Sequence, residues 1–379
     1  MLEATESIIN LQEDDIDDNV LYYDYNIKHL LSLIKAKVPE DDNRYLSSFR
    51  SFEGEVFENY MYEKLLAYVQ TQDEVEKFVL KGHHQSRDKA FANTLSISEK
   101  SQIVYRTKSR EIGEFDALIF TKKELYFVEM TLVKSVLKLK KRLRKKKALL
   151  ETIFPDYEIK ALIILNEGVS GVKQLPPYCK VWITKSFSSQ KVLDYLKNRR
   201  AYERKPKKEM DSKKMVEAQS LKIFPFRYYN TLSWITRSLR SNRNQLINMK
   251  FLTDPLTQRY HDLYTKIYLG FMYPSEFKKI MNIKADIKND QKIIVALEKK
   301  HSDEIVLTYY IQYTRKKLDY ISYNDEGAMI VEKKDPYGIT VTEVYHVTKL
   351  MDKSFSLSAN NIKTIANLLK ESFASMDKR

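Results

Sequence analysis

Two carboxylates lie within the most strand-like segment of the sequence, GEFDALIFTKKELYFVEMT at residues 113–131. The aromatic and branched runs 115–121 and 125–131 are separated by the charged tip KKE, which predicts a β-hairpin. Because side chains alternate along a strand, Asp116 and Glu129 can meet on one face near the open end of this hairpin. Two unpaired carboxylates at close range repel each other, and a divalent cation removes that cost. Hard oxygen ligands suit Mg²⁺ or Mn²⁺, so the pair predicts a metal site.

A strongly basic segment follows the hairpin. Residues 134–147, KSVLKLKKRLRKKK, contain nine basic residues and no acid. A metal that activates water, beside cations that hold a phosphate backbone, is what metal-assisted phosphodiester cleavage requires. The plainer alternative is that each acid pairs with a lysine at a sheet edge and that the basic residues form a solvated helix face.

The elements that must position these residues follow an α/β order. Residues 51–70 have apolar side chains near helical spacing, and residues 135–152 predict a second helix. Beyond the hairpin, strands are expected at 158–165 and 179–185. We therefore expect an α/β fold in which a mixed sheet is flanked by helices.

The composition limits the possible functions. With 379 residues, of which 43% are hydrophobic, the chain can bury a sizeable core and hold about two domains. The net charge of +14 favours a polyanionic partner such as nucleic acid. A single cysteine, Cys179, excludes an intramolecular disulfide and a CxxC zinc site, which fits a reducing compartment. There is no signal-peptide pattern and no apolar run of about 18 residues, so a cytoplasmic protein without a membrane partner is expected.

The pattern GEFDALIF…LYFVEMT resembles the core of the PD-(D/E)xK nuclease superfamily, in which a metal-binding Asp and Glu lie on consecutive strands. The preceding FEGEVFENYMYEKLLAYV is similar to the first helix of that fold, where Gly54 and then Glu58 lead into an apolar helix. The resemblance covers roughly residues 50–186. It implies a restriction-endonuclease-like core and a metal-dependent endonuclease that hydrolyses phosphodiester bonds of DNA or RNA with Mg²⁺ or Mn²⁺.

The resemblance also assigns ligands. It implies that Asp116 and Glu129 bind the metal, with the Met130 carbonyl as a third ligand. Glu58, expected at the start of the first helix, would join them directly, through water, or as a ligand of a second metal. The alternative for Glu58 is an exposed helical glutamate.

One position departs from the family pattern. The lysine of the E-x-K triplet is replaced by Thr131, whose hydroxyl carries no charge. The chain is therefore most similar to branches in which the lysine moves to the following helix, such as cap-snatching-type endonucleases. On a helical wheel the expected buried stripe consists of Val136, Leu139, Leu143 and Leu150. Lys140 flanks this stripe, so we predict that it replaces the missing lysine, with Lys134 at the helix entry as the second candidate. Six other basic residues of the segment are predicted to contact nucleic acid: Lys138, Lys141, Arg142, Arg144, Lys145 and Lys147.

The helix histidine that many of these enzymes use has no clear counterpart. His83 and His84 fall in an expected loop after a strand, and solvated side chains are expected there.

The sequence predicts four segments. Residues 1–50 form an acidic leader and a short helix, 51–190 the nuclease-like domain, 191–215 a basic linker, and 216–379 a C-terminal α+β domain. In that last domain, 216–285 is expected to be mostly helical, 292–349 an antiparallel meander, and 360–373 a closing helix. Its aromatic and basic residues are compatible with binding nucleic acid or a partner.

Three hypotheses remain open. The chain is a metal-dependent nuclease, a catalytically inactive nucleic-acid-binding module that keeps the fold, or an interaction protein whose basic face binds an acidic partner. The sequence does not distinguish DNA from RNA and indicates no oligomeric state.

Overall fold

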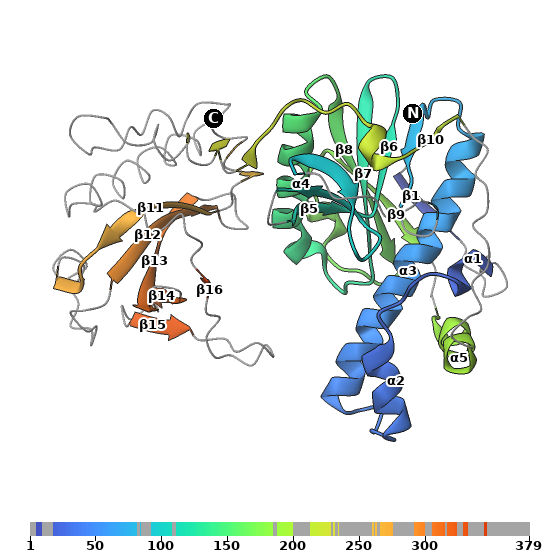
Figure 1. The fold of residues 1–379 in the computed structure, drawn as a ribbon, viewed down its shortest axis with the longest axis horizontal. Helices are drawn as coiled ribbons and strands as arrows, with labels where there is room; N and C mark the ends of the chain where they lie inside the picture. Colours follow the sequence, from blue (N-terminus) through green and yellow to red (C-terminus); the bar gives the residue numbers. More distant parts are fainter. Residues whose placement is uncertain are drawn as a thin grey trace. The chain divides into compact units, whose positions relative to one another are not determined.

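We describe the fold from a computed structural model of the chain (Figure 1). The residues that it describes are 5–9, 18–81, 84, 92–107, 111–184, 188–199, 213–228, 230–231, 234, 260, 262–263, 266–275, 292–299, 305–314, 317–323, 329–332 and 345–346. They form two compact units, Met1–Arg227 and Tyr228–Arg379. The predicted α/β fold is confirmed at the level of a mixed sheet with helices.

The first unit is built on a seven-stranded mixed sheet with the order β1-β9-β8-β7-β6-β2-β10. The antiparallel β6–β7 hairpin is the predicted one, and β8 and β9 continue the sheet in parallel. In chain order the strands are β1 (Thr5–Ile9), β2 (Lys77–Val79), β6 (Ala117–Phe120), β7 (Glu124–Thr131), β8 (Glu158–Asn166), β9 (Cys179–Thr184) and β10 (Met215–Val216). A smaller antiparallel sheet contains β3 (Thr94–Ile97), β4 (Ile103–Arg106) and β5 (Glu111–Phe115).

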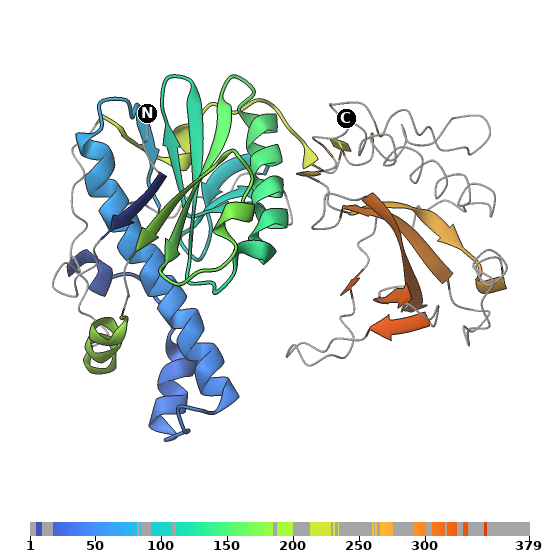
Figure 2. The ribbon, with the colours of Figure 1, turned by 180° about the vertical axis from the view of Figure 1, so that it is seen from behind.

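Helices cover both faces of the main sheet (Figures 1 and 2). The long helix α3 (Asn43–Thr71) lies on one face, and α4 (Leu139–Ile153) lies on the other, after a 3₁₀ turn at Val136–Lys138. The helix α4 belongs to the connection between β7 and β8. These two strands are parallel neighbours, so the connection must pass over one face of the sheet.

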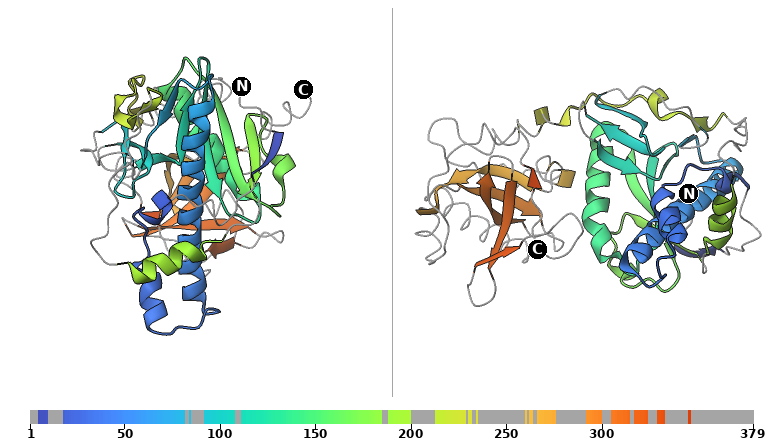
Figure 3. Two further views of the ribbon diagram at one scale, coloured as in Figure 1. Left: turned by 90° about the vertical axis from the view of Figure 1, so that its right-hand side faces the viewer. Right: turned by 60° about the horizontal axis from the view of Figure 1, so that its bottom comes forward.

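The shorter helices gather around α3. Its first half extends beyond the sheet beside α2 (Lys28–Lys35), and α1 (Asp18–Leu21) lies between α3 and α5 (Gln190–Asn198) (Figures 1 and 3). No helix among the described residues combines the length and the apolar character that crossing a membrane requires.

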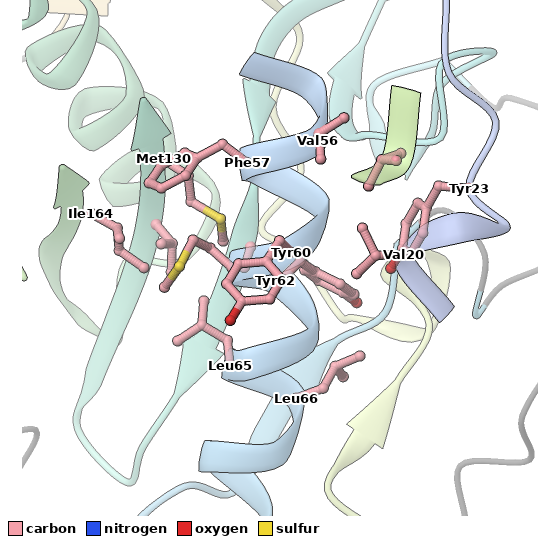
Figure 4. Packing of buried hydrophobic residues seen from close by; sticks show 14 of the residues in the cluster. Val20, Tyr23, Val56, Phe57, Tyr60, Tyr62, Leu65, Leu66, Met130 and Ile164 are labelled. Carbon is pink, nitrogen blue, oxygen red and sulfur yellow. The ribbon is translucent and has the colours of Figure 1, made fainter. Parts of the chain in front are cut away.

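The larger core forms between α3 and the sheet. Tyr62 and Leu65 of α3 point toward Met130 and Ile164 on the strands, and the opposite side of the helix packs on α1 through residues such as Val20 (Figure 4). Both sides of α3 are therefore buried along its second half. The polar and apolar residues of α3 are not separated onto two faces of the helix. The helix is stable here because both of its sides are packed, and not because one face is solvated.

The second unit contains an antiparallel sheet. Its strands are β11 (Lys266–Met272), β12 (Lys292–Lys299), β13 (Ile305–Thr314), β14 (Lys317–Tyr323), β15 (Met329–Glu332) and β16 (Tyr345–His346). The predicted meander is confirmed where residues are described. The helical prediction is wrong at Lys266–Met272, whose alternating Ile, Leu and Phe pair with β12 instead. The closing helix predicted at 360–373 lies outside the described residues.

The first unit is longer than the sequence suggested, at both ends. Thr5–Ile9 of the acidic leader pairs with β9. At the other end, β10 pairs with β2 beyond the basic segment 191–215, and the Tyr105 hydroxyl donates a 2.7 Å hydrogen bond to the Phe226 carbonyl. These contacts place residues 216–227 in the first unit, not in the C-terminal one.

Candidate active site

The chain changes sheets at Asp116. It leaves the small sheet at the end of β5, bends at Asp116 and enters the main sheet as β6. Ala117 pairs with Val128, so Asp116 is the next residue in register opposite Glu129. The strand register thus places the two acids opposite each other near the open end of the hairpin, where the sequence predicts that they meet.

Glu129 faces away from α3. Val128 and Met130 belong to the core under α3, so Glu129 between them lies on the α4 side of the sheet, and Asp116 lies at the bend that precedes β6. The side chains of Asp116 and Glu129 are buried, with relative exposures of 4% and 3%. Buried carboxylates are costly unless they are hydrogen-bonded or paired, so the contacts around them decide what the site can do.

Asp116 is held by the backbone of β7. The Met130 N–H donates a 2.7 Å hydrogen bond to Oδ2 of Asp116. The N–H and C=O of one strand residue point to the same neighbouring strand. The Met130 carbonyl therefore faces the side of β7 on which Asp116 lies. Its predicted role as a metal ligand remains a prediction.

Glu129 is held by two cations from α4. Lys146 Nζ lies 2.5 Å from its Oε2, and the Arg142 guanidinium pairs with its Oε1. Burial raises the pKa of Glu129, and the nearby Asp116 adds to this, so the net shift is upward although Lys146 and Arg142 oppose it. Burial lowers the pKa of Lys146, but the charges of Glu129 and Asp116 outweigh it and keep the ammonium protonated.

The cation beside the acids is therefore Lys146, where the sequence favoured Lys140 or Lys134. Lys140 is half-buried and Lys134 exposed, and neither ammonium forms an ion pair among the described residues. The missed signal was that Lys146 lies three residues after Leu143 and four before Leu150, within the buried stripe itself. A lysine in such a stripe requires an acid on the facing strand, and the sequence contained that acid.

Glu58 approaches from the helix on the other face. Burial and the charge of Asp116 raise the pKa of Glu58 to about 8, with Lys81 opposing them and Glu129 adding to them. Its Oε2 accepts a 3.2 Å hydrogen bond from Gln102 Nε2. Because α3 begins at Asn43, Glu58 lies in the middle of a helix, and its predicted place at a helix start is wrong.

The other basic residues of the segment differ in their surroundings. Arg142, predicted to contact nucleic acid, pairs with Glu129, yet half of its side chain (49%) is exposed. Lys147 pairs with Glu151 and lies over the Tyr178 ring. Lys138 is exposed, whereas Lys141, Arg144 and Lys145 are half-buried. Nucleic-acid contact by these residues remains a prediction.

A second buried polar group, the Glu63 cluster, lies on α3 away from the acid pair and consists of Asn19, Tyr23, Glu63 and His84. Glu63 accepts hydrogen bonds from the Tyr23 hydroxyl at 2.7 Å and from Asn19 Nδ2 at 3.3 Å, and His84 Nε2 lies 2.6 Å from it. Burial alone would raise the pKa of Glu63, but His84, Tyr23 and Asn19 lower it below its usual value.

His84 corrects an expectation. Its side chain is fully buried, not solvated, because it reaches Glu63 on α3. His83 lies outside the described residues. No local sequence pattern indicates this contact, since Glu63 and His84 belong to different elements.

The donor set partly fits a hard divalent cation. Within the described ranges, no three His, Cys, Asp or Glu side chains converge closely enough to form a ready-made metal cage. Mg²⁺ is commonly held by one or two carboxylates together with water and substrate phosphate, which Asp116 and Glu129 can supply. Burial, and then the neighbouring acids, raise the pKa of Glu58 and of Glu129, and a bound divalent cation would favour the charged form of both groups.

Comparison with known proteins adds no assignment. No family model, no curated protein sequence and no solved structure matches this chain.

Proposed function

We propose that this chain is a metal-dependent nuclease that hydrolyses phosphodiester bonds of DNA or RNA. The observation that carries the proposal is the buried pair Asp116 and Glu129, opposed across β6 and β7, with Lys146 of the following helix 2.5 Å from Glu129. The order α3, antiparallel β2, β6 and β7, then α4 and a parallel β8 supports a restriction-endonuclease-like core.

Each residue of the site has a defined task in this proposal. Asp116 and Glu129 would hold Mg²⁺ or Mn²⁺, which activates water and neutralises charge on the scissile phosphate when bound. Lys146 keeps Glu129 oriented and supplies the positive charge that Thr131 lacks. Arg142 is half-exposed, so its guanidinium can leave Glu129 and bind a phosphate oxygen.

One observation favours the inactive binding module as the second candidate. Both oxygens of Glu129 are engaged by cations of the chain itself, so the protein stabilises this carboxylate without a metal. A chain that kept this arrangement in complex with nucleic acid would bind without cleaving.

The test is cleavage by the full chain. Labelled single- and double-stranded DNA and RNA are incubated with Mg²⁺ or Mn²⁺, using the parent, Asp116→Asn and Glu129→Gln. The control is Glu158→Gln, an exposed acid at the start of β8. The parent and the control should cleave at least one substrate, and the two site variants should lose at least a hundredfold in rate, on the order of the electrostatic contributions known at such sites.

The outcomes separate the hypotheses. Cleavage that survives both site substitutions would assign the activity elsewhere or to a contaminant. Absence of cleavage on the whole panel, with salt-dependent binding retained, would favour the binding module.

A further inference from the structure

A second buried lysine lies near the acids. Lys81 follows β2, and its side chain is among the largest that are fully buried, with a relative exposure of 1%. Lysine is almost never fully buried without a partner, because an ammonium loses its hydration there. The surroundings of Lys81 therefore need an explanation.

The ammonium of Lys81 has no carboxylate in salt-bridge contact within the described part of the chain. Its Nζ lies 5.0 Å from the centre of the Tyr62 ring, which is a cation–π contact. Its charge also lowers the pKa of Glu58, one helical turn before Tyr62 on α3, against the larger effects that raise it. Lys81 thus lies beside the stretch of α3 that carries Glu58 and Tyr62.

The backbone around Lys81 is fixed to α3 at two points. Its N–H donates a 2.8 Å hydrogen bond to the Tyr62 hydroxyl. Three residues later, His84 binds Glu63, and the His84 N–H donates to the Lys81 carbonyl at 3.3 Å. The two anchors hold the lysine stem against α3, so the position of the ammonium is built into the fold.

We propose that Lys81 is a phosphate-binding residue of this site, which rests on the nucleic-acid substrate proposed above. Lys146 is committed to Glu129 at 2.5 Å, whereas Lys81 retains the capacity for charge-assisted hydrogen bonds. A phosphodiester that approaches Asp116 and Glu129 meets repulsion from these carboxylates. Lys81 supplies the compensating positive charge from the α3 side and contacts a non-bridging phosphate oxygen.

The experiment measures binding without chemistry. A fluorescent single-stranded oligonucleotide is titrated with the full chain in EDTA at several salt concentrations, using the parent, Lys81→Met and Lys180→Met. Methionine keeps the apolar stem length and removes the charge. Lys180 is the matched control, because its Nζ lies 5.5 Å from the Tyr126 ring but it belongs to β9.

Lys81→Met should bind about tenfold more weakly than the parent, and its salt slope should fall by about one, as expected for the loss of one phosphate contact. Lys180→Met should match the parent. Equal affinity and slope for Lys81→Met and the parent would overturn the proposal, as would equal losses in both variants or no binding by the parent. If Lys81→Met does not fold, Lys81→Gln and the charge-retaining Lys81→Arg test the proposal. Only Lys81→Gln should reduce the salt slope of binding.

This result is independent of the nuclease assay. Binding in EDTA that depends on Lys81 would stand even if the parent cleaved nothing, and cleavage by the parent would stand even if Lys81 were dispensable.

Discussion

At the scale of single residues, the chemistry depends on how Glu129 is neutralised. A buried carboxylate opposite a second one is unfavourable, and Lys146 and Arg142 offset this cost from one face of α4, four residues apart. Removing one partner of a buried ion pair leaves an uncompensated charge, which costs more than the pair itself contributes. The two cations are not equivalent, because Lys146 is buried and Arg142 is half-exposed.

The first prediction concerns Lys146. If the chain is a nuclease, Lys146→Met should lower the single-turnover cleavage rate by about 10²–10³-fold, because the charge beside Glu129 is lost. Lys140→Met, on the same helix, should stay within about threefold of the parent, since its ammonium contacts neither acid. Rates are corrected for the folded fraction, measured by thermal unfolding. A loss in Lys140→Met with an active Lys146→Met would restore the original assignment.

The second prediction concerns Arg142 and the metal. Arg142 and a divalent cation compete for the same Glu129 carboxylate, so Arg142→Ala should bind Mn²⁺ more tightly than the parent by about tenfold. Isothermal titration calorimetry measures this directly. Lys138→Ala, an exposed cation of the same segment, serves as the control and should change little. Weaker Mn²⁺ binding in Arg142→Ala would show that the guanidinium does not occupy the metal position.

At the scale of elements, α3 serves two sides at once. Glu58 and Tyr62 lie one turn apart on the side of Lys81, while Glu63 binds Asn19 of α1 and Tyr23, which follows α1. The Glu63 cluster also anchors His84, so it joins α1, α3 and the segment after β2. Such a hydrogen-bonded buried cluster fixes the arrangement of elements more specifically than apolar packing does.

The third prediction tests this cluster. Tyr23→Phe removes a 2.7 Å hydrogen bond to a buried carboxylate and should lower the free energy of unfolding at pH 7 by about 1.5–3 kcal/mol. Chemical denaturation measures it. Tyr45→Phe, at a buried ring near the start of α3, is the control and should cost less than about 0.5 kcal/mol.

The effect of Tyr23→Phe should also depend on pH. The pKa of Glu63 is lowered in the folded chain from its usual 4.5, so its stabilisation is present above pH 4.5 and is lost as the pH falls through the folded value. The difference between Tyr23→Phe and the parent should therefore shrink in acid. A difference that stays constant from pH 7 to below the folded pKa would show that Glu63 is not the charged partner.

At the scale of the whole molecule, the first unit is completed by residues from the end of the basic segment 191–215 onward. The Lys214 ammonium donates to the Gln72 carbonyl at 2.6 Å and so satisfies the C-terminal end of α3. The carbonyls of Lys214 and Val216 each accept a 2.8 Å hydrogen bond from β2 or the residue after it, and Phe226 is bound by Tyr105. These contacts extend the edge of the sheet beside the segment that carries Lys81.

The fourth prediction follows from this closure. Residues 1–227 expressed alone should unfold in one cooperative transition, because the unit retains its complete core. Residues 1–199, which keep α5 but lack β10, should have a clearly lower melting temperature, by 5 °C or more, since several backbone hydrogen bonds are lost. Circular dichroism melting compares the two. Equal melting temperatures would place the boundary of the unit before residue 200.

The sequence by itself determined what depends on local pattern. The hairpin, the strands after α4 and the apolar stripe follow from periods of two and 3.6 residues, and the structure has them. The stripe consists of Val136, Leu139, Leu143 and Leu150. The helical assignment of Lys266–Met272 failed because a short apolar run fits both periods, and pairing with β12 decided it.

Only the tertiary structure decided which cations and acids meet. Lys146, Lys81 and His84 reach their partners on elements that lie far away in sequence, through the crossover of α4 and the packing of α3 on the sheet. The midpoint position of Glu58 likewise depends on a helix that starts at Asn43. A helical wheel gives the direction of a side chain but not the identity of the strand it faces. The register and the helix packing supply that identity, and with it the charge balance of the site.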